Sequence, residues 1–292
     1  MYQLIGAKLS RQWRSAAPAT RASPYNSGLL TEAQREQVDV VLVSPRNPLN
    51  IGAAARAMAN FGFTRLTVVA PFEAHWREAK SAVGAPDLLK NARETATLAE
   101  AVAACTFVVG TGTLQHRKPE QKVVCLTDVP SLMADALHLG TRIADGRMAL
   151  VFGPEKHGLT REDLSYCHCL VEIPTAPRQP SMNLGQAVAV CLYELTRPAQ
   201  SLADVRSWGA ANRTEEALAD AASGTLDRLV EAIEETMRAA DYSPQIMEAA
   251  NRHDLRLVVR RLHWTEADVR RALGIFRRIL WRLKRPRSTT PQ

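Results

Sequence analysis

The amino-acid sequence predicts an α/β fold, with a parallel sheet flanked by helices, followed by a small all-α domain. From Val38 onward, apolar runs of strand length alternate with helix-like segments, an order typical of parallel sheets. Gly, Pro and Asn gather directly after several of these runs. Beyond residue 222, apolar residues recur at helical spacing. Because ligands bind at the carboxyl ends of parallel strands, the small and polar residues there mark the expected site.

The expected elements follow one another in a regular order. Apolar runs of strand length lie at residues 38–44, 65–70, 106–110, 148–152 and 170–173. The expected helices between and after them lie at residues 51–61, 97–104 and 183–195. Loops with Pro or Gly separate strand from helix, as at Pro45, Pro48 and the turn 110–112. We therefore expect helices on both faces of the sheet.

Four segments are expected along the chain, namely a flexible basic arm at 1–37, an α/β domain at 38–198, a linker at 199–222 and a basic helical domain at 223–287. The arm lacks hydrophobic periodicity and is rich in Ala, Ser and Arg, which is typical of a disordered extension. The same composition is typical of an organelle transit peptide, and that alternative stays open. In the helical domain, apolar residues recur at helical spacing from Leu226 to Met237.

The net charge of +7 is unevenly placed. Residues 251–287 hold 12 Lys and Arg against 3 Asp and Glu, and residues 1–31 hold 4 basic and no acidic side chains. The rest of the chain is therefore net acidic. A polyanion such as RNA that docks on the basic ends would explain this asymmetry, and a solvated helix surface is the alternative.

Hydropathy and cysteine usage narrow the class of protein. No apolar run approaches the ~18 residues of a membrane span, so no membrane partner is expected. The five cysteines form no CxxC pair, and their odd number argues against a disulfide framework, so a reduced, cytoplasmic protein is expected. Cys167, His168 and Cys169 are consecutive in a strand-like stretch and should point to alternating faces, so no metal site is predicted.

Common cofactor motifs are missing from the places where they would be expected. The loop after the first strand reads SPRNPLNIG rather than the GxGxxG of a dinucleotide-binding fold. The chain also has no GxxxxGK[ST] phosphate loop and no GxSxG nucleophile elbow. NAD binding, P-loop chemistry and α/β-hydrolase chemistry are therefore disfavoured.

Three other stretches follow strand ends in order. The first is NIGAAARA at 50–57, the second is LVFGPEKHGLT at 150–160, and the third is IP at 173–174 with SMNLGQAV at 181–188. Together they resemble the motifs of the SPOUT methyltransferases, in the SpoU/TrmH-type group that methylates ribose 2′-hydroxyls of RNA. Within that superfamily the chain is most similar to the bacterial tRNA enzymes that act at nucleotide 32 (Cm32/Um32), in which a helical domain also follows the catalytic one.

The resemblance implies a fold, a cofactor and partners. It implies a deep C-terminal trefoil knot, an exception to the general absence of knots. It further implies S-adenosyl-L-methionine as cofactor, a tRNA substrate rather than DNA, and a homodimer with the cofactor site beside the partner subunit. The related ribosomal RNA enzymes usually carry a substrate domain ahead of the catalytic one, and 37 residues are too few to form it.

The resemblance also implies the residues that do the chemistry. Those near the reacting ribose would be Asn50, Arg56, Glu155, Ser181 and Asn183. The family is commonly described as using this arginine as the general base. Because a guanidinium titrates above pH ~12, we favour stabilisation of the developing oxyanion, with a substrate phosphate taking the proton. The displacement at a sulfonium methyl itself requires no metal.

The cofactor would be held by loops after three strands. The residues that the resemblance places around it are Thr111, Gly112, Thr113, Gly153, Gly158, Ile173, Pro180, Ser181, Met182 and Leu184. Pro180 and Met182 stand where near relatives often have Ser and Leu. A side-chain contact from position 180 would therefore be lost, whereas contacts made by the backbone would remain.

Simpler interpretations stay open for each of these residues. Asn50, Ser181 and Asn183 could only cap helices, and Glu155 could be a solvated surface carboxylate. At the level of function, the alternatives are a ribosomal RNA 2′-O-methyltransferase and a non-catalytic RNA-binding SPOUT protein. Cofactor binding would distinguish the last of these from an enzyme.

Overall fold

A computed structural model describes residues 30–112, 119–130, 132, 146–197, 220–242 and 245–284. The core of the fold is a seven-stranded sheet in the order β3-β2-β1-β6-β4-β7-β5, in which every neighbouring pair of strands is parallel. The strands are β1 (Val38–Val43), β2 (Arg65–Val69), β3 (Arg93–Thr95), β4 (Phe107–Thr111), β5 (Lys122–Cys125), β6 (Met148–Phe152) and β7 (Cys169–Glu172).

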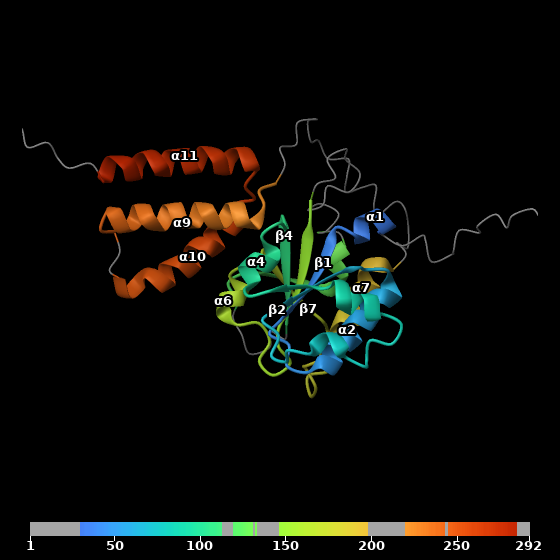
Figure 1. The fold of residues 1–292 in the computed structure, drawn as a ribbon. Helices are drawn as coiled ribbons and strands as arrows, with labels where there is room; N and C mark the ends of the chain where they lie inside the picture. The colour runs from blue at the N-terminus through green and yellow to red at the C-terminus, as the bar shows by residue number, and fades with distance from the viewer. Residues whose placement is uncertain are drawn as a thin grey trace, which may run out of the picture.

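Helices cover both faces of the sheet, as Figure 1 shows. The α-helices are α1 (Glu32–Arg35), α2 (Pro48–Phe61), α3 (Pro86–Asn91), α4 (Leu98–Val102), α6 (Arg161–Leu164), α7 (Leu184–Thr196), α9 (Ser223–Ala239), α10 (Glu248–Arg261) and α11 (Glu266–Leu283). Short 3-10 turns lie at Trp76–Glu78, Leu126–Asp128 and Gln245–Met247. The predicted α/β class with a parallel sheet is therefore confirmed.

Each face of the sheet has its own apolar core. The larger core joins the sheet to α2 and α7, and the smaller one joins it to α4 and to the residues around α6. Helices α2 and α7 approach closely because Gly185 has no side chain; a Cβ there would lie 2.6 Å from the Cβ of Ala53. This contact fixes the start of α7 against the start of α2.

The central strands lie where the hydropathy pattern predicts them, whereas several peripheral elements were not predicted. The unpredicted strands are β3 and β5, and the unpredicted α-helices are α1, α3, α6 and α10. Helix α2 begins at Pro48 rather than at Ile51, because the Asn47 side chain accepts a hydrogen bond from the Leu49 N–H and caps it. Within the range expected for the arm, Leu30 is buried in the larger core and α1 follows it. Residues 1–29 lie outside the described part.

Helices α9, α10 and α11 surround a third apolar cluster beyond the sheet (Figure 1). The start of α9 is tied to the α/β part, since the Ser223 N–H donates to the Cys105 carbonyl and the Gly224 N–H to the Ala103 carbonyl, each at 2.9 Å. Most of the expected linker at 199–222 lies outside the described residues. Its last residues are packed, with Ala221 buried and Asp220 bridged to Thr265.

Cys167 and Cys169 lie on opposite faces of the sheet, whereas alternation within one strand would place them on the same face; the difference arises because β7 begins only at Cys169. Cys167 belongs to the smaller core and Cys169 to the larger one, and between them His168 Nδ1 accepts a hydrogen bond from the Val108 N–H at 3.0 Å. These three side chains therefore do not converge. None of the helices in the described ranges is long and apolar enough to cross a bilayer.

Candidate functional site

A cavity of about 290 Å³ opens at the carboxyl edge of the sheet. Strands β6, β4 and β7 are neighbours and run parallel, so the loops that follow them meet at this edge. The walls are formed by Thr111, Gly112, Phe152, Gly153, Pro154, Glu155, Lys156, His157, Gly158, Leu159, Leu164, Leu170, Ile173, Thr175, Pro180, Ser181, Met182, Leu184 and Ala187. The second and third of the stretches singled out after strand ends thus supply most of this lining, whereas the first, at 50–57, supplies none of it.

The loop after β6 is folded tightly on itself. A Cβ on Gly153 would collide with the backbone of Gly158 and Leu159, so only glycine fits there. Gly158 has a φ of +64°, which L side chains rarely adopt, and its N–H donates to the Pro154 carbonyl at 2.8 Å. Leu159 then enters the smaller core. The loop therefore presents backbone to the cavity and anchors itself by a leucine.

The end of β4 forms another wall. The Thr111 hydroxyl donates to the Val151 carbonyl at 3.0 Å, and the Gly112 N–H donates to the Val171 carbonyl at 3.2 Å. Space is open around the position where a Gly112 Cβ would lie. Thr113, which was predicted with them, lies outside the described residues.

The loop before α7 closes the cavity on the remaining side. The Thr175 hydroxyl donates to the Pro180 carbonyl at 3.0 Å, which bends the loop back on itself. Ser181 and Met182 are exposed along the wall, and Leu184 is buried. Ser181 caps no helix in the structure, whereas Asn183 does: its Oδ1 accepts from the Gly185 N–H at 2.9 Å.

Glu155 is held by neutral hydrogen-bond donors at the start of α2 and in the loop before it. One of its oxygens accepts from the Asn50 side-chain amide at 2.7 Å, and the carboxylate also accepts from the backbone N–H groups of Arg46 (3.2 Å) and Asn47 (3.4 Å). Partial desolvation raises the pKa of Glu155, but these hydrogen bonds outweigh it and hold the pKa below its usual value. The carboxylate is thus ionised at neutral pH and fixed in place.

Asn50 connects this carboxylate to the third stretch. While its amide nitrogen donates to Glu155, its Oδ1 accepts from the Asn183 amide at 2.9 Å. Asn50 lies inside the first turn of α2, so it is not the helix cap that its position suggested. A chain of hydrogen bonds from Glu155 through Asn50 to Asn183 therefore joins all three stretches.

Arg56 stands apart from this network. It lies on α2, is exposed, and does not line the cavity. Within the residues that the structure describes, it makes no hydrogen bond or ion pair. Six residues after Asn50 correspond to about 600° of helix rotation, which places the two side chains on different faces of α2. One subunit therefore brings Asn50, Glu155 and Asn183 together and leaves Arg56 outside.

The cavity contains residues that the sequence did not single out. Every predicted cofactor residue in the described ranges lines it, and so do Lys156, His157 and Thr175. Lys156 and His157 follow Glu155 directly in the second stretch, so their place in the motif was a signal that could have been used.

The polar lining of the cavity is mostly neutral. Glu155 is the one carboxylate among the described lining residues, and it is turned to amide donors. Much of the remaining wall is backbone, glycine and small apolar side chains. Such a wall suits a ligand with a flat ring and hydrogen-bonding edges, and its rim carries the positive charge of Lys156.

A parallel sheet whose carboxyl edge gathers three loops around one cavity defines an α/β protein that binds a small ligand beyond its strand ends. A model of the SpoU rRNA Methylase family matches residues 37–193. The chain belongs to this family.

Individual relatives carry RNA methyltransferase names. The chain is 41% identical over 162 residues to the tRNA (cytidine/uridine/adenosine-2′-O-)-methyltransferase TrmJ of Pseudomonas aeruginosa (strain UCBPP-PA14), covering 55% of this chain and 60% of the relative. It is 32% identical over 242 residues to the uncharacterized tRNA/rRNA methyltransferase LasT of Escherichia coli (strain K12), covering 80% and 99%. The match spans 60% of the Pseudomonas relative, and 66% and 63% of relatives from Methanocaldococcus jannaschii and Haemophilus influenzae. The chain therefore matches less than two thirds of the length of these three curated relatives.

Among solved structures, the crystal structure of TrmJ from Z. mobilis ZM4 is similar with a TM-score of 0.69 and 26% sequence identity. The superposition covers 82% of this chain and 98% of that one. This superposition covers a larger share of the chain than residues 37–193, which the family model matches.

Proposed function

We propose that this protein transfers a methyl group from S-adenosyl-L-methionine to a ribose 2′-hydroxyl of tRNA, at nucleotide 32 of the anticodon loop. The observation that carries the proposal is the single cavity lined by the loops after β4, β6 and β7, with a hydrogen-bonded chain that joins Glu155, Asn50 and Asn183 beside it. Membership of the SpoU family and the names of the tRNA-modifying relatives support it.

The cavity residues would hold the cofactor mainly through backbone groups and apolar contacts. Gly153 and Gly158 would allow the loop to approach the adenine edge closely, and Ile173 and Leu184 would pack against the ring. The bound cofactor would supply an electrophilic methyl on a sulfonium. Ser181, exposed at the rim, would orient the attacking ribose, and the Glu155 network would keep the three loops in register.

Arg56 would serve a neighbouring site in a homodimer. It is exposed, does not line the cavity of its own subunit, and makes no hydrogen bond or ion pair among the described residues. In a dimer that places the cavity beside the partner subunit, the guanidinium would reach the partner's substrate and stabilise the alkoxide that develops on the 2′-oxygen. It would remain charged throughout, since guanidinium titrates above pH ~12.

The remaining parts of the proposal concern the fold, the domains and the location of the protein. We propose a trefoil knot formed by the loops around the cavity, an N-terminal arm, a catalytic domain at 38–198, a linker, and a basic helical domain at 223–287 that docks tRNA through its phosphates. Cytoplasmic tRNA would be the substrate pool. The exposed arginines of α11 support the docking role.

Ribosomal RNA is the second candidate substrate. The family name refers to rRNA methylases, and the relative LasT is named a tRNA/rRNA methyltransferase. A protein that binds RNA without catalysis is the remaining alternative. Retention of Asn50, Arg56, Glu155, Ser181 and Asn183 together supports an enzyme.

Two measurements test the proposal. Isothermal titration of the full chain with S-adenosyl-L-methionine should give saturable binding; no binding would favour a non-catalytic protein. Mapping of 2′-O-methylated riboses in total RNA from a deletion strain should then show loss at tRNA nucleotide 32. Loss at a ribosomal position, with tRNA unchanged, would move the activity to the second candidate.

A further inference from the structure

The wall of the cavity that follows β6 is supported from outside by helix α10. This wall ends in α6, a single turn of four residues with no buried side chain of its own. A Thr160–Asp163 capping box closes the turn, with the Thr160 N–H donating to Asp163 at 2.8 Å. Because one helical turn is marginal by itself, α6 depends on neighbouring contacts for its position.

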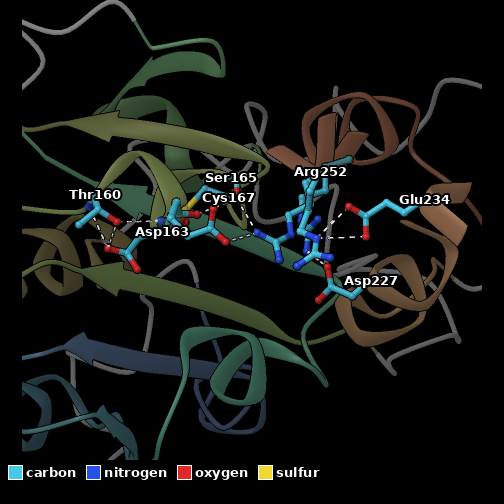
Figure 2. Close-up of polar contacts among 10 residues, drawn as sticks. Thr160, Asp163, Ser165, Cys167, Asp227, Glu234 and Arg252 are labelled. Carbon is cyan, nitrogen blue, oxygen red and sulfur yellow. Dashed lines mark hydrogen bonds and ion pairs between the residues drawn. The ribbon is translucent and has the colours of Figure 1, made fainter. Parts of the chain in front are cut away.

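Those contacts come from α10 (Figure 2). Arg256 forms an ion pair with Glu162 of α6, and its guanidinium lies 4.3 Å from the centroid of the Tyr166 ring. The Arg260 guanidinium lies 5.4 Å from the centroid of the same ring and pairs with Asp227 of α9 at 2.8 Å. In Figure 2 the segment that carries Thr160, Asp163 and Ser165 lies opposite the helices that carry Asp227, Glu234 and Arg252.

Burial makes these contacts different from ordinary surface ion pairs. The Arg256 side chain is 12% exposed and that of Arg260 is 1% exposed. Stacking over an aromatic ring is stronger when the cation is desolvated, and it fixes the orientation of the guanidinium plane. A pair between exposed side chains would hold α6 only weakly.

Leu159 and Leu164 carry this support to the cavity. Both residues line the cavity described above, and both also line a second hollow of about 350 Å³ on the other side. His253 of α10 reaches that second hollow, and its Nε2 lies 3.5 Å from a Glu120 oxygen. Leu159 and Leu164 are thus shared by the cavity and by a hollow that His253 of α10 also lines.

We propose that α10 supports this wall, and that Arg256 is a positioning residue for cofactor binding that acts through Glu162 and Tyr166. The identity of the cofactor rests on the function proposed above. A shift of α6 moves Leu159, and Leu159 is bonded to the segment that folds back on Gly153. By the reciprocity of coupled equilibria, RNA that repositions the helical domain changes cofactor affinity, and cofactor changes RNA affinity by the same factor.

The test compares two arginines of α10 in the full chain. Arg256→Ala removes the contact to α6, whereas Arg252→Ala, one turn earlier, removes a pair with Glu234 inside the helical domain. Titration with S-adenosyl-L-methionine should show Kd about fivefold or more higher for Arg256→Ala, and unchanged for Arg252→Ala. Arg256→Lys should recover part of the affinity through the ion pair. Equal affinity of folded Arg256→Ala and wild type overturns the proposal.

A second measurement does not depend on the cofactor. Amide hydrogen exchange of residues 153–164 should become faster in Arg256→Ala than in Arg252→Ala, because the wall opens more often. If Arg256→Ala fails to fold, Glu162→Gln removes the same ion pair from its 61% exposed side and should give the same two results. If the wild-type protein binds no S-adenosyl-L-methionine, the proposed function is rejected, but hydrogen exchange still tests the role of α10. Unchanged exchange of residues 153–164 in a folded variant overturns the proposal that α10 supports the wall.

Discussion

The carboxyl edge of the sheet and the outward face of α11 use polar groups in opposite ways. At the sheet edge, the polar groups are already engaged: Glu155 accepts from Asn50 and two backbone N–H groups. On α11, Arg277 and Arg282 are exposed and make no hydrogen bond or ion pair within the described residues. Arg278 is stacked on the exposed Trp281. Polar groups that are already fixed by hydrogen bonds suit one small ligand, whereas free cations suit a long polyanion. Substitutions in the two regions should therefore alter different measurements.

Arg56 should give the largest effect and tests the contrast between the two regions, because it is a cation without a hydrogen bond or ion pair in the described α/β part. Arg56→Ala should lower the single-turnover methylation rate by ~10²-fold or more, the scale for loss of one oxyanion donor, while cofactor affinity persists. The measurement is rapid-quench methyl transfer at saturating cofactor and tRNA.

Two further results refine the Arg56 prediction. Rescue by Arg56→Lys would indicate simple charge stabilisation, whereas continued inactivity would indicate a bidentate contact or proton transfer. A general base would also make the rate rise with pH up to its own titration. Wild-type turnover in Arg56→Ala would remove this residue from the mechanism.

Gly153→Ala tests the fixed geometry of the sheet edge. The added Cβ collides with the backbone of Gly158 and Leu159, so the free energy of unfolding should fall by about 1–3 kcal/mol and cofactor affinity should fall with it. Gly274→Ala is the control, since nothing lies near its Cβ and alanine in α11 should stabilise the protein by up to about 1 kcal/mol. Thermal and denaturant unfolding measure both, and normal stability of Gly153→Ala would contradict the tight loop.

Replacement of Arg277, Arg278 and Arg282 by Ala tests the other region. Affinity for tRNA should fall about tenfold at physiological salt, and the slope of log K against log salt should become less steep by up to about 3, because fewer counterions are released. Cofactor affinity should not change. Filter binding across a salt series gives both quantities, and an unaltered slope would make this face a solvated helix surface.

The smallest expected effect is that of pH on Glu155. Its pKa is lowered in the folded state, so its contribution to stability is complete above the ordinary carboxyl pKa and is lost as pH falls through the lowered value. Glu155→Gln should therefore be less stable than wild type near pH ~7, and the difference should shrink as the pH falls below the ordinary carboxyl pKa. Glu78→Gln, which changes an exposed carboxylate, serves as the control. A difference that persists in acid would mean that the side chain contributes by shape alone.

The central part of the fold was predictable because it obeys simple periodicities. The strand β6 has the bounds, residues 148–152, that the hydropathy pattern gives. The edge strands β3 and β5 were missed because they bury few side chains, so they show little apolar alternation. Helix α10 was missed because its buried face includes His253 and Arg260, which weakens the apolar stripe. Polar residues that are buried by tertiary contacts cannot be recognised from local pattern.

The same distinction applies to the site. Residues at strand ends were predicted to converge, and the structure places them around one cavity because the strands are neighbours in a parallel sheet. The partners of Glu155 could not be predicted, since Arg46, Asn47 and Asn50 lie more than a hundred residues away and meet it only through strand order. The position of Arg56 relative to a substrate depends on assembly, which no local pattern contains.

The burial of four cysteines has a practical consequence for thiol chemistry. Cys105, Cys167, Cys169 and Cys191 are buried, and desolvation raises the pKa of Cys169 and of Cys191 to about 12, so little thiolate forms at neutral pH. Cys125, at the end of β5, is exposed. A maleimide dye should therefore attach at one position on the carboxyl edge of the sheet, which provides a fluorescent reporter of ligand binding without any engineered cysteine.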